Sequence, residues 1–133
     1  MKRVVWLALL AGILAASASC GGDGTASRPG TLSVRLTSPN SGSDSAIVFT
    51  VSGPAPLTSA TPGPGLRLFQ QALGGTSTRF ALTGQLNTGA VILTIGVADV
   101  GVVSQYTGTI QGIAQGNYQL RVLPGNYALA ITR

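Results

Sequence analysis

The stretch TLSVRLTSPNSGSDSAIVFTVSG, residues 31–53, decides the fold class. Residues 31–38 alternate apolar and polar side chains, which is the period of a strand with one buried face. Residues 45–53 repeat the pattern, with Ile47, Phe49 and Val51 on the expected inner face. Because the residues between them are typical of a turn, we predict that the two strands form an antiparallel hairpin.

Further strands are predicted toward the C-terminal side of this stretch, separated by turn signals about every ten residues. Residues 53–65 hold four prolines, so we expect a loop without ladder pairing, fixed to the core by Leu57. Residues 90–100 are apolar with little alternation, which predicts a central strand. A Pro-Gly turn within residues 123–126 favours a last strand that crosses to the other sheet. The other expected strands are residues 66–71, 78–84, 104–115, 116–124 and 125–133.

No helical spacing is found after residue 20, so the chain is predicted to be all-β. The expected architecture is a single antiparallel β-sandwich of about eight to nine strands, following an N-terminal signal helix. The corresponding segments are a signal peptide over residues 1–19, a flexible tether over 20–30 and the sandwich domain over 31–133.

The N-terminal residues are typical of an export signal. Lys2 and Arg3 precede thirteen apolar residues, 4–16, and small residues follow them. A membrane-spanning helix needs about 20 apolar residues, so this run is too short to be one. A basic start, a short apolar run and small residues together predict a secretory signal peptide.

The single cysteine stands at the end of this signal. Ser17-Ala18-Ser19-Cys20 resembles the lipobox of bacterial lipoproteins, although that family usually has leucine at the place of Ser17. The resemblance implies that Cys20 is acylated, that cleavage precedes it, and that a lipid anchor holds the protein to the cell envelope. Gly21 and Gly22, with no aspartate beside the cysteine, imply the outer membrane where the host has one. The alternative is cleavage after Ala18, which would release a soluble secreted protein.

Composition restricts the classes of partner and chemistry. Beyond residue 19 the chain has six scattered arginines and three aspartates, and it has no dense basic stripe. We therefore expect no nucleic-acid partner. The chain has no histidine and no cluster of metal ligands, so we expect no enzyme, no metal and no cofactor. Asp44 is expected to cap a turn. Asp99 is expected to cap the turn at Gly101, with an arginine pair or a calcium ligand as alternatives.

The strand order also resembles that of the cohesin-type domain. The resemblance is carried by AIVFTVSGPAPLTSATPG, residues 46–63, and GAVILTIGVADVGVVSQYTGTIQGI, residues 89–113. Cohesins are jelly-roll sandwiches close to some carbohydrate-binding modules, and they bind dockerin modules through one sheet face. The resemblance therefore implies a jelly-roll fold and a non-enzymatic interaction or structural module.

Two kinds of partner follow from this prediction. The first is a protein at the cell surface, which would require an exposed apolar patch on one sheet face. The alternative is a glycan, which would make the chain a carbohydrate-binding module. The candidate ligand contacts in that case are Tyr106, Tyr118 and Tyr127, as a flat exposed strip.

Overall fold

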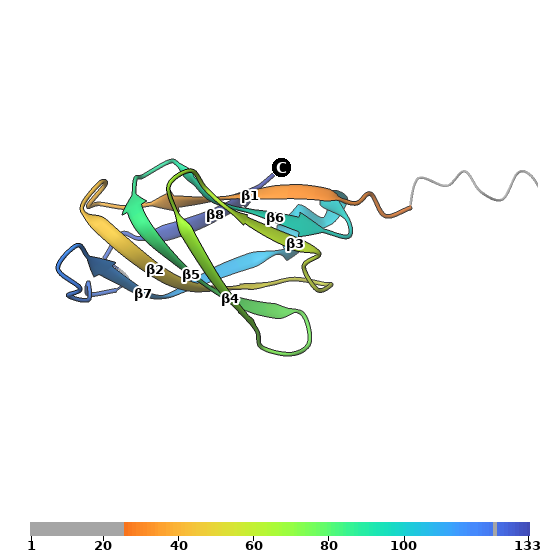
Figure 1. The fold of residues 1–133 in the computed structure, drawn as a ribbon. Helices are drawn as coiled ribbons and strands as arrows, with labels where there is room; N and C mark the ends of the chain where they lie inside the picture. The colour runs from red at the N-terminus through yellow and green to blue at the C-terminus, as the bar shows by residue number, and fades with distance from the viewer. Residues whose placement is uncertain (1–25, 124) are drawn as a thin grey trace, which may run out of the picture.

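The structure, a computed structural model, describes residues 26–123 and 125–133. It is an antiparallel β-sandwich with one 3-10 helix, η1, over Val100–Gln105. The strands are β1 (Gly30–Thr37), β2 (Asp44–Ser52), β3 (Ser59–Pro62), β4 (Arg67–Ala72), β5 (Ser77–Leu86), β6 (Val91–Val97), β7 (Thr107–Gln115) and β8 (Ala128–Thr132). Figure 1 shows the two layers, with sheet A (β1, β3, β6 and β8) above and sheet B (β2, β4, β5 and β7) below.

The strand order shows how the chain is wound. Sheet A has the order β3-β6-β1-β8, and sheet B has the order β4-β5-β2-β7. The paired strands are nested along the chain. The pair β4·β5 lies between β3 and β6, these lie between β2 and β7, and β1 pairs with β8 outside them all. The arrangement is that of one long hairpin rolled into two sheets. This nested pairing is that of a jelly roll.

The core fills the space between the sheets with the inward residues of both. The Phe49 and Phe80 rings lie at its centre, with their centroids 5.6 Å apart and both side chains fully buried. Ile47, Phe49 and Val51 are all buried, which confirms the predicted face of the second strand. The central position of β6 and the packing of Leu57 on the core are also confirmed.

Three expectations about strands are wrong. The first two strands do not form a hairpin, because β1 pairs with β6 and β8 in sheet A while β2 pairs with β5 and β7 in sheet B. The turn between them, closed by a hydrogen bond from the Ser43 amide to the Asn40 carbonyl, carries the chain from one sheet to the other. Alternation determines which face of a strand is buried, but it does not determine the neighbour.

The second error concerns the proline-rich loop. Residues 59–62 within it form β3, which pairs with β6. A short strand is tolerated there because it lies at the sheet edge and its proline, Pro62, is its last residue.

The third error concerns residues 116–124, which were expected to form a strand. The segment turns at Tyr118, where φ is +66°, and only Leu120 forms a bridge, to Ala114 of β7. The last strand, β8, does cross to the other sheet as predicted, since β7 belongs to sheet B and β8 to sheet A.

Candidate functional site

The acylation site predicted at Cys20 lies outside the described residues. In the part of the chain that the structure describes, no helix is long and apolar enough to cross a membrane. The described part also contains no group of three or more residues able to hold a metal ion.

The three candidate tyrosines lie in different surroundings. Tyr106 is buried, and its ring packs so closely on Gly53 that a Cβ there would lie 2.2 Å from it. Burial raises the pKa of the Tyr106 hydroxyl. Tyr118 is 90% exposed, whereas Tyr127 is half-buried with its hydroxyl near Asp44.

Tyr106 and Tyr127 also lie at opposite ends of β2. Tyr106 contacts Gly53, directly after β2, and Tyr127 contacts Asp44, its first residue. The nine residues of β2 extend over roughly 27 Å at about 3.4 Å per residue. The structure therefore does not bring the three tyrosines together into one flat strip.

Asp44 does not cap an exposed turn as expected, because its side chain is fully buried within a hydrogen-bond network. The Ser38 hydroxyl and the Tyr127 hydroxyl donate to Oδ2 at 2.7 Å and 2.9 Å. Arg121 Nε donates to Oδ1 at 2.9 Å, which forms an ion pair. Asn40 completes the network by donating from Nδ2 to the Tyr127 hydroxyl at 2.8 Å.

This network fastens the C-terminal segment to the sandwich. Ser38 and Asp44 flank the turn between β1 and β2, whereas Arg121 and Tyr127 belong to the segment between β7 and β8. Since both carboxylate oxygens are occupied and no part of Asp44 reaches solvent, the group cannot contact a ligand in this structure. Its role is to hold the segment in place.

Asp99 has the predicted role of a cap. Its Oδ1 accepts hydrogen bonds from the Gly101 amide at 2.8 Å and from the Arg28 amide at 3.3 Å. These two backbone donors, in that order, hold the pKa of Asp99 below its usual value, because they stabilise the charged carboxylate. Asp99 follows β6 and Asp44 begins β2, at opposite ends of the sandwich, so the two do not form a carboxylate pair.

The outer face of sheet B carries the features that sequence reasoning missed. Phe69 is 55% exposed, although it belongs to a regular strand. The register aligns it with Ala81 of β5, then Val48 of β2, then Gly112 of β7. We call these four residues the Phe69 row. It crosses all four strands, and beyond Phe69 it consists only of small or short side chains.

Two shallow hollows lie along the Phe69 row and share Val48, and together we call them the groove. One hollow of about 300 Å³ lies beside Phe69 and is lined by Val48, Arg79 and Ala81 among others. A second, of about 80 Å³, lies over Gly112 and ends at Leu120, whose side chain is 77% exposed. At strand spacings of about 4.8 Å, the distance from β4 to β7 is roughly 14 Å.

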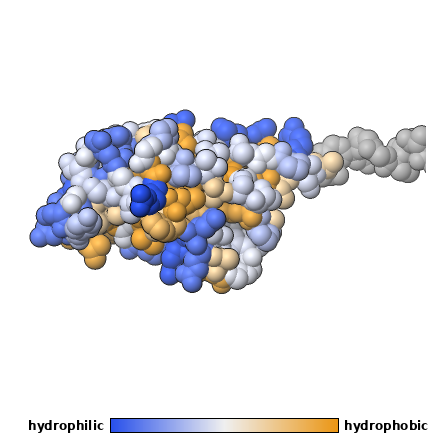
Figure 2. Space-filling view, in the orientation of Figure 1, coloured by the Kyte–Doolittle hydropathy of each residue, from blue (hydrophilic) through white to orange (hydrophobic). Residues whose placement is uncertain are grey.

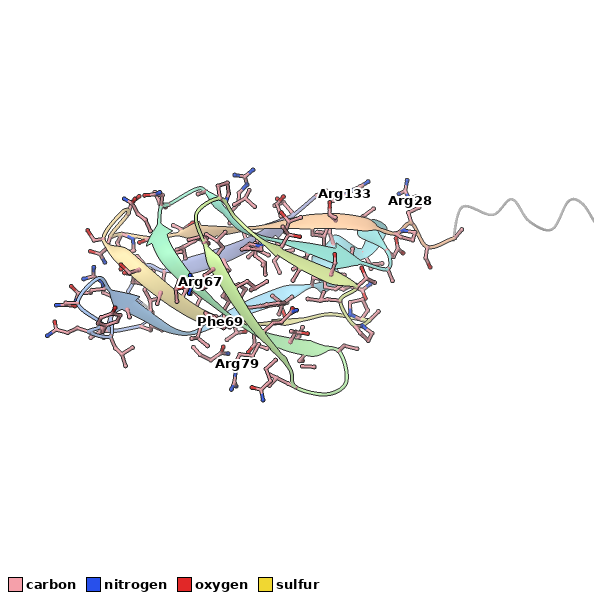
Figure 3. The ribbon with its side chains drawn as sticks, in the orientation of Figure 1. Arg28, Arg67, Phe69, Arg79 and Arg133 are labelled. Carbon is pink, nitrogen blue, oxygen red and sulfur yellow. The ribbon has the colours of Figure 1, made fainter. Side chains whose placement is uncertain are left out.

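Arginines flank the Phe69 end of this groove. Arg67 and Phe69 are two residues apart on β4 and face outward together, and Arg79 of β5 lies opposite Gln71. Figure 3 shows Arg67, Phe69 and Arg79 along the same pair of strands, away from Arg28 and Arg133. The alternation in LRLFQQ, residues 66–71, predicts this outward face, because Arg67 and Phe69 flank Leu68, which packs on the core.

Apolar surface is also exposed along the sides of the sandwich, between the edges of the two sheets. Figure 2 shows hydrophobic atoms gathered in the middle of the side on which the edge strands β3 and β4 lie in Figure 1, around one strongly hydrophilic residue. A larger hollow, of about 550 Å³, lies between the edge strands β7 and β8 and is lined by Gly108, Ile110 and Leu129 among others. Ile110 and Leu129 also pack on the core, so this hollow is the open side of the sandwich.

Comparison with known proteins adds no assignment. No protein family, no curated protein and no solved structure matches the chain.

Proposed function

We propose that this chain is a lipid-anchored, non-enzymatic interaction module of the bacterial cell envelope, of cohesin-like type, which binds its partner through the outer face of sheet B. The observation that carries the proposal is the Phe69 row, in which the exposed Phe69 ring and three half-buried residues without polar side chains cross a regular sheet. A solvated sheet face is ordinarily polar, and exposed apolar patches on monomers commonly mark contact sites.

The sequence supports the anchored location. Lys2, Arg3 and the apolar run 4–16 are typical of an export signal, and Ser17-Ala18-Ser19-Cys20 resembles a lipobox. Several acyl chains on Cys20 would give stable attachment, because each buried CH₂ adds about 0.8 kcal/mol. The glycines after Cys20 favour the outer membrane where the host has one. A soluble secreted β domain, cleaved after Ala18, is the alternative.

The position of Arg28 makes such an anchor compatible with an accessible sheet face. The described chain begins at one end of the sandwich, beside Arg28 (Figure 3). An anchor on the N-terminal side of it would attach at that end, and the outer faces of both sheets would stand along the sides. The outer face of sheet B would then be open to a partner at the cell surface.

A carbohydrate-binding module is the second candidate function. Phe69 favours it, because an exposed aromatic ring offers an apolar platform to the C–H face of a sugar. Polar side chains that can bond to hydroxyl groups lie on either side of the Phe69 row. These are Thr83 on one side, and Gln71, Thr50 and Gln111 on the other.

The first part of the test concerns the anchor. Mass spectrometry of the membrane fraction should find an acylated Cys20 at the mature N-terminus. A mature chain that begins at Ser19 and carries a free thiol would contradict the anchored location.

The second part concerns the contact surface. The Cys20→Ser variant of the full chain cannot be acylated, so its sedimentation with washed envelope measures binding through the sandwich alone. Gly112→Tyr should abolish this sedimentation, because a Cβ on Gly112 has no atom within 4 Å and the new side chain would fill the groove without disturbing the fold. Ala130→Tyr is the matched control, since Ala130 is exposed on β8 of sheet A. Equal sedimentation of both variants would exclude the outer face of sheet B as the contact surface.

A further inference from the structure

The groove on sheet B has uncompensated positive charge at one end. Arg67 and Arg79 are both exposed on this face. The one ion pair among residues 26–123 and 125–133 joins Arg121 to Asp44, whose carboxylate is fully buried and does not reach the outer face of sheet B. Asp99, the other carboxylate in this part of the chain, caps η1 beside Arg28. No described acidic side chain therefore neutralises the two groove arginines.

The spacing of these arginines selects a repeating ligand. Arg79 lies opposite Gln71, so it is four residues along β4 and one strand across from Arg67. At about 3.4 Å per residue and about 4.8 Å per strand, their backbones are roughly 14 Å apart. Because Phe69 lies between the two arginines, a chain with regularly repeated acidic groups can pair with both guanidinium groups and contact the ring at the same time.

The side chains between the arginines suggest what kind of chain this is. Phe69 lies between them on the same face and offers an exposed ring to the apolar face of a sugar unit. Ala81 and Val48 keep the groove floor low beside the ring. Thr83 and Gln71 place a hydroxyl and an amide next to Phe69, and these groups both donate and accept hydrogen bonds, as sugar hydroxyls require.

We infer that the outer face of sheet B binds an acidic polysaccharide, with Arg67 and Arg79 pairing with successive acidic groups and Phe69 stacking on the sugar between them. Arginine suits this role because its planar guanidinium forms two parallel hydrogen bonds with a carboxylate or a sulfate. The inference rests on the proposed function, since it names the partner class of the same surface. It differs from a protein-docking role, in which the apolar floor would supply most of the affinity.

The test measures binding of the full-length Cys20→Ser variant to polygalacturonate and to dextran sulfate at low ionic strength. Neutral dextran and polyglutamate serve as comparison polymers. We expect binding to at least one acidic polysaccharide, weakening as salt screens the charges. Arg67→Gln and Arg79→Gln should each weaken it about threefold to tenfold and reduce its salt dependence. Arg133→Gln, which makes the same charge change on the chain beyond β8, should leave the affinity within about twofold.

Phe69→Ala separates stacking from general electrostatic attraction. It should weaken binding to the acidic polysaccharide about fivefold while leaving the salt dependence unchanged, because it removes no charge. Polyglutamate should bind more weakly than the polysaccharide, and Phe69→Ala should leave that weaker binding unaffected.

Three results would overturn the inference. They are equal binding of polyglutamate and polysaccharide, equal effects of Arg67→Gln and Arg133→Gln, and no binding of either acidic polysaccharide. Envelope sedimentation that is still abolished by Gly112→Tyr would, in any of these cases, leave the proposed interaction module standing with a protein partner. Loss of polysaccharide binding together with unchanged sedimentation of Gly112→Tyr would instead count against both.

Discussion

Each end of the sandwich has an aspartate with a tyrosine near it, and the two ends use these residues in opposite ways. At one end Asp44 is buried and the Tyr127 hydroxyl donates to it. At the other end Asp99 caps η1 with backbone hydrogen bonds, and the Tyr106 ring packs against Gly53. The first end depends on polar groups in the interior, whereas the second combines a surface cap with an apolar contact.

The difference lies in the distance along the chain to each partner. Asp99 accepts from Gly101, only two residues away, so its role could be predicted from the local sequence. The partners of Asp44 include Arg121 and Tyr127, which are 77 and 83 residues away. Aspartates in similar turn-forming stretches can therefore have unrelated roles, and only the tertiary fold distinguishes them.

The largest expected effect comes from removing the buried carboxylate. Asp44→Ala should lower the free energy of unfolding by about 3–5 kcal/mol, because it leaves Arg121 unpaired in a mostly buried site. The 19% exposure of the Arg121 side chain places the expected value toward the lower end of this range. Urea unfolding followed by fluorescence or circular dichroism measures the loss.

Asp44→Asn is the control for this prediction. It preserves the shape of the side chain and one acceptor oxygen while removing the charge, so its loss should be smaller than that of Asp44→Ala. A loss below about 1 kcal/mol for Asp44→Ala would mean that the buried end is no more dependent on its aspartate than the exposed end.

A matched pair of tyrosine substitutions gives an intermediate effect. Tyr127→Phe should cost about 1–3 kcal/mol, because the hydroxyl donates to Asp44 and accepts from Asn40. Tyr106→Phe should change stability by less than about 0.5 kcal/mol, since the hydrogen bonds found within the described residues include none from its hydroxyl. Chemical denaturation of both variants tests the contrast, and equal losses would remove it.

The smallest effect is expected at Asp99, and it should depend on pH. The hydrogen bonds from Gly101 and Arg28 lower the pKa of Asp99 in the fold, so the carboxylate stabilises the fold above its unfolded pKa of about 3.9. This contribution is lost as the pH falls through the lower folded pKa. Asp99→Asn should therefore be less stable than the parent at pH 7, and the two should converge in acid.

Thermal denaturation of the parent and of Asp99→Asn between pH 2 and pH 7 measures this convergence. A stability difference that stays constant over that range would show that the carboxylate charge has no part in the cap. A loss at pH 7 as large as that of Asp44→Ala would show that the two ends do not differ as described.

Alternation predicted which residues of each strand are buried, because burial depends on a strand and its own two faces. It placed Ile47, Phe49 and Val51 in the core correctly. It could not give the partner of β1, because the choice between β2 and the more distant β6 and β8 depends on how the whole chain is wound. The hairpin was expected from nearness in sequence, whereas the sandwich separates these two strands into different sheets.

The candidate groove was predictable only in part. Arg67 and Phe69 alternate with the core residue Leu68, and β5 follows after a short turn, so Arg79 could have been placed nearby. The positions of Val48 and Gly112 in the floor could not be predicted from the sequence, because they depend on the pairing of β2 with β5 and β7. The tyrosines were predicted as ligand contacts instead, because a sequence gives the aromatic residue type but not the exposure of the side chain.

The nested pairing of the strands also affects the order in which an exported chain can fold. Under the proposed export, the chain would cross the membrane unfolded and emerge from its N-terminus onward, so that β1 would arrive first and its partner β8 last. The hairpin β4·β5 can close early because its loop is short, whereas closing β1·β8 requires ordering almost the whole chain. Until Ala128–Thr132 had emerged, one edge of β1 would remain unpaired and open to other chains. The period of greatest vulnerability to aggregation and proteolysis is therefore the time between the emergence of the first strand and that of the last.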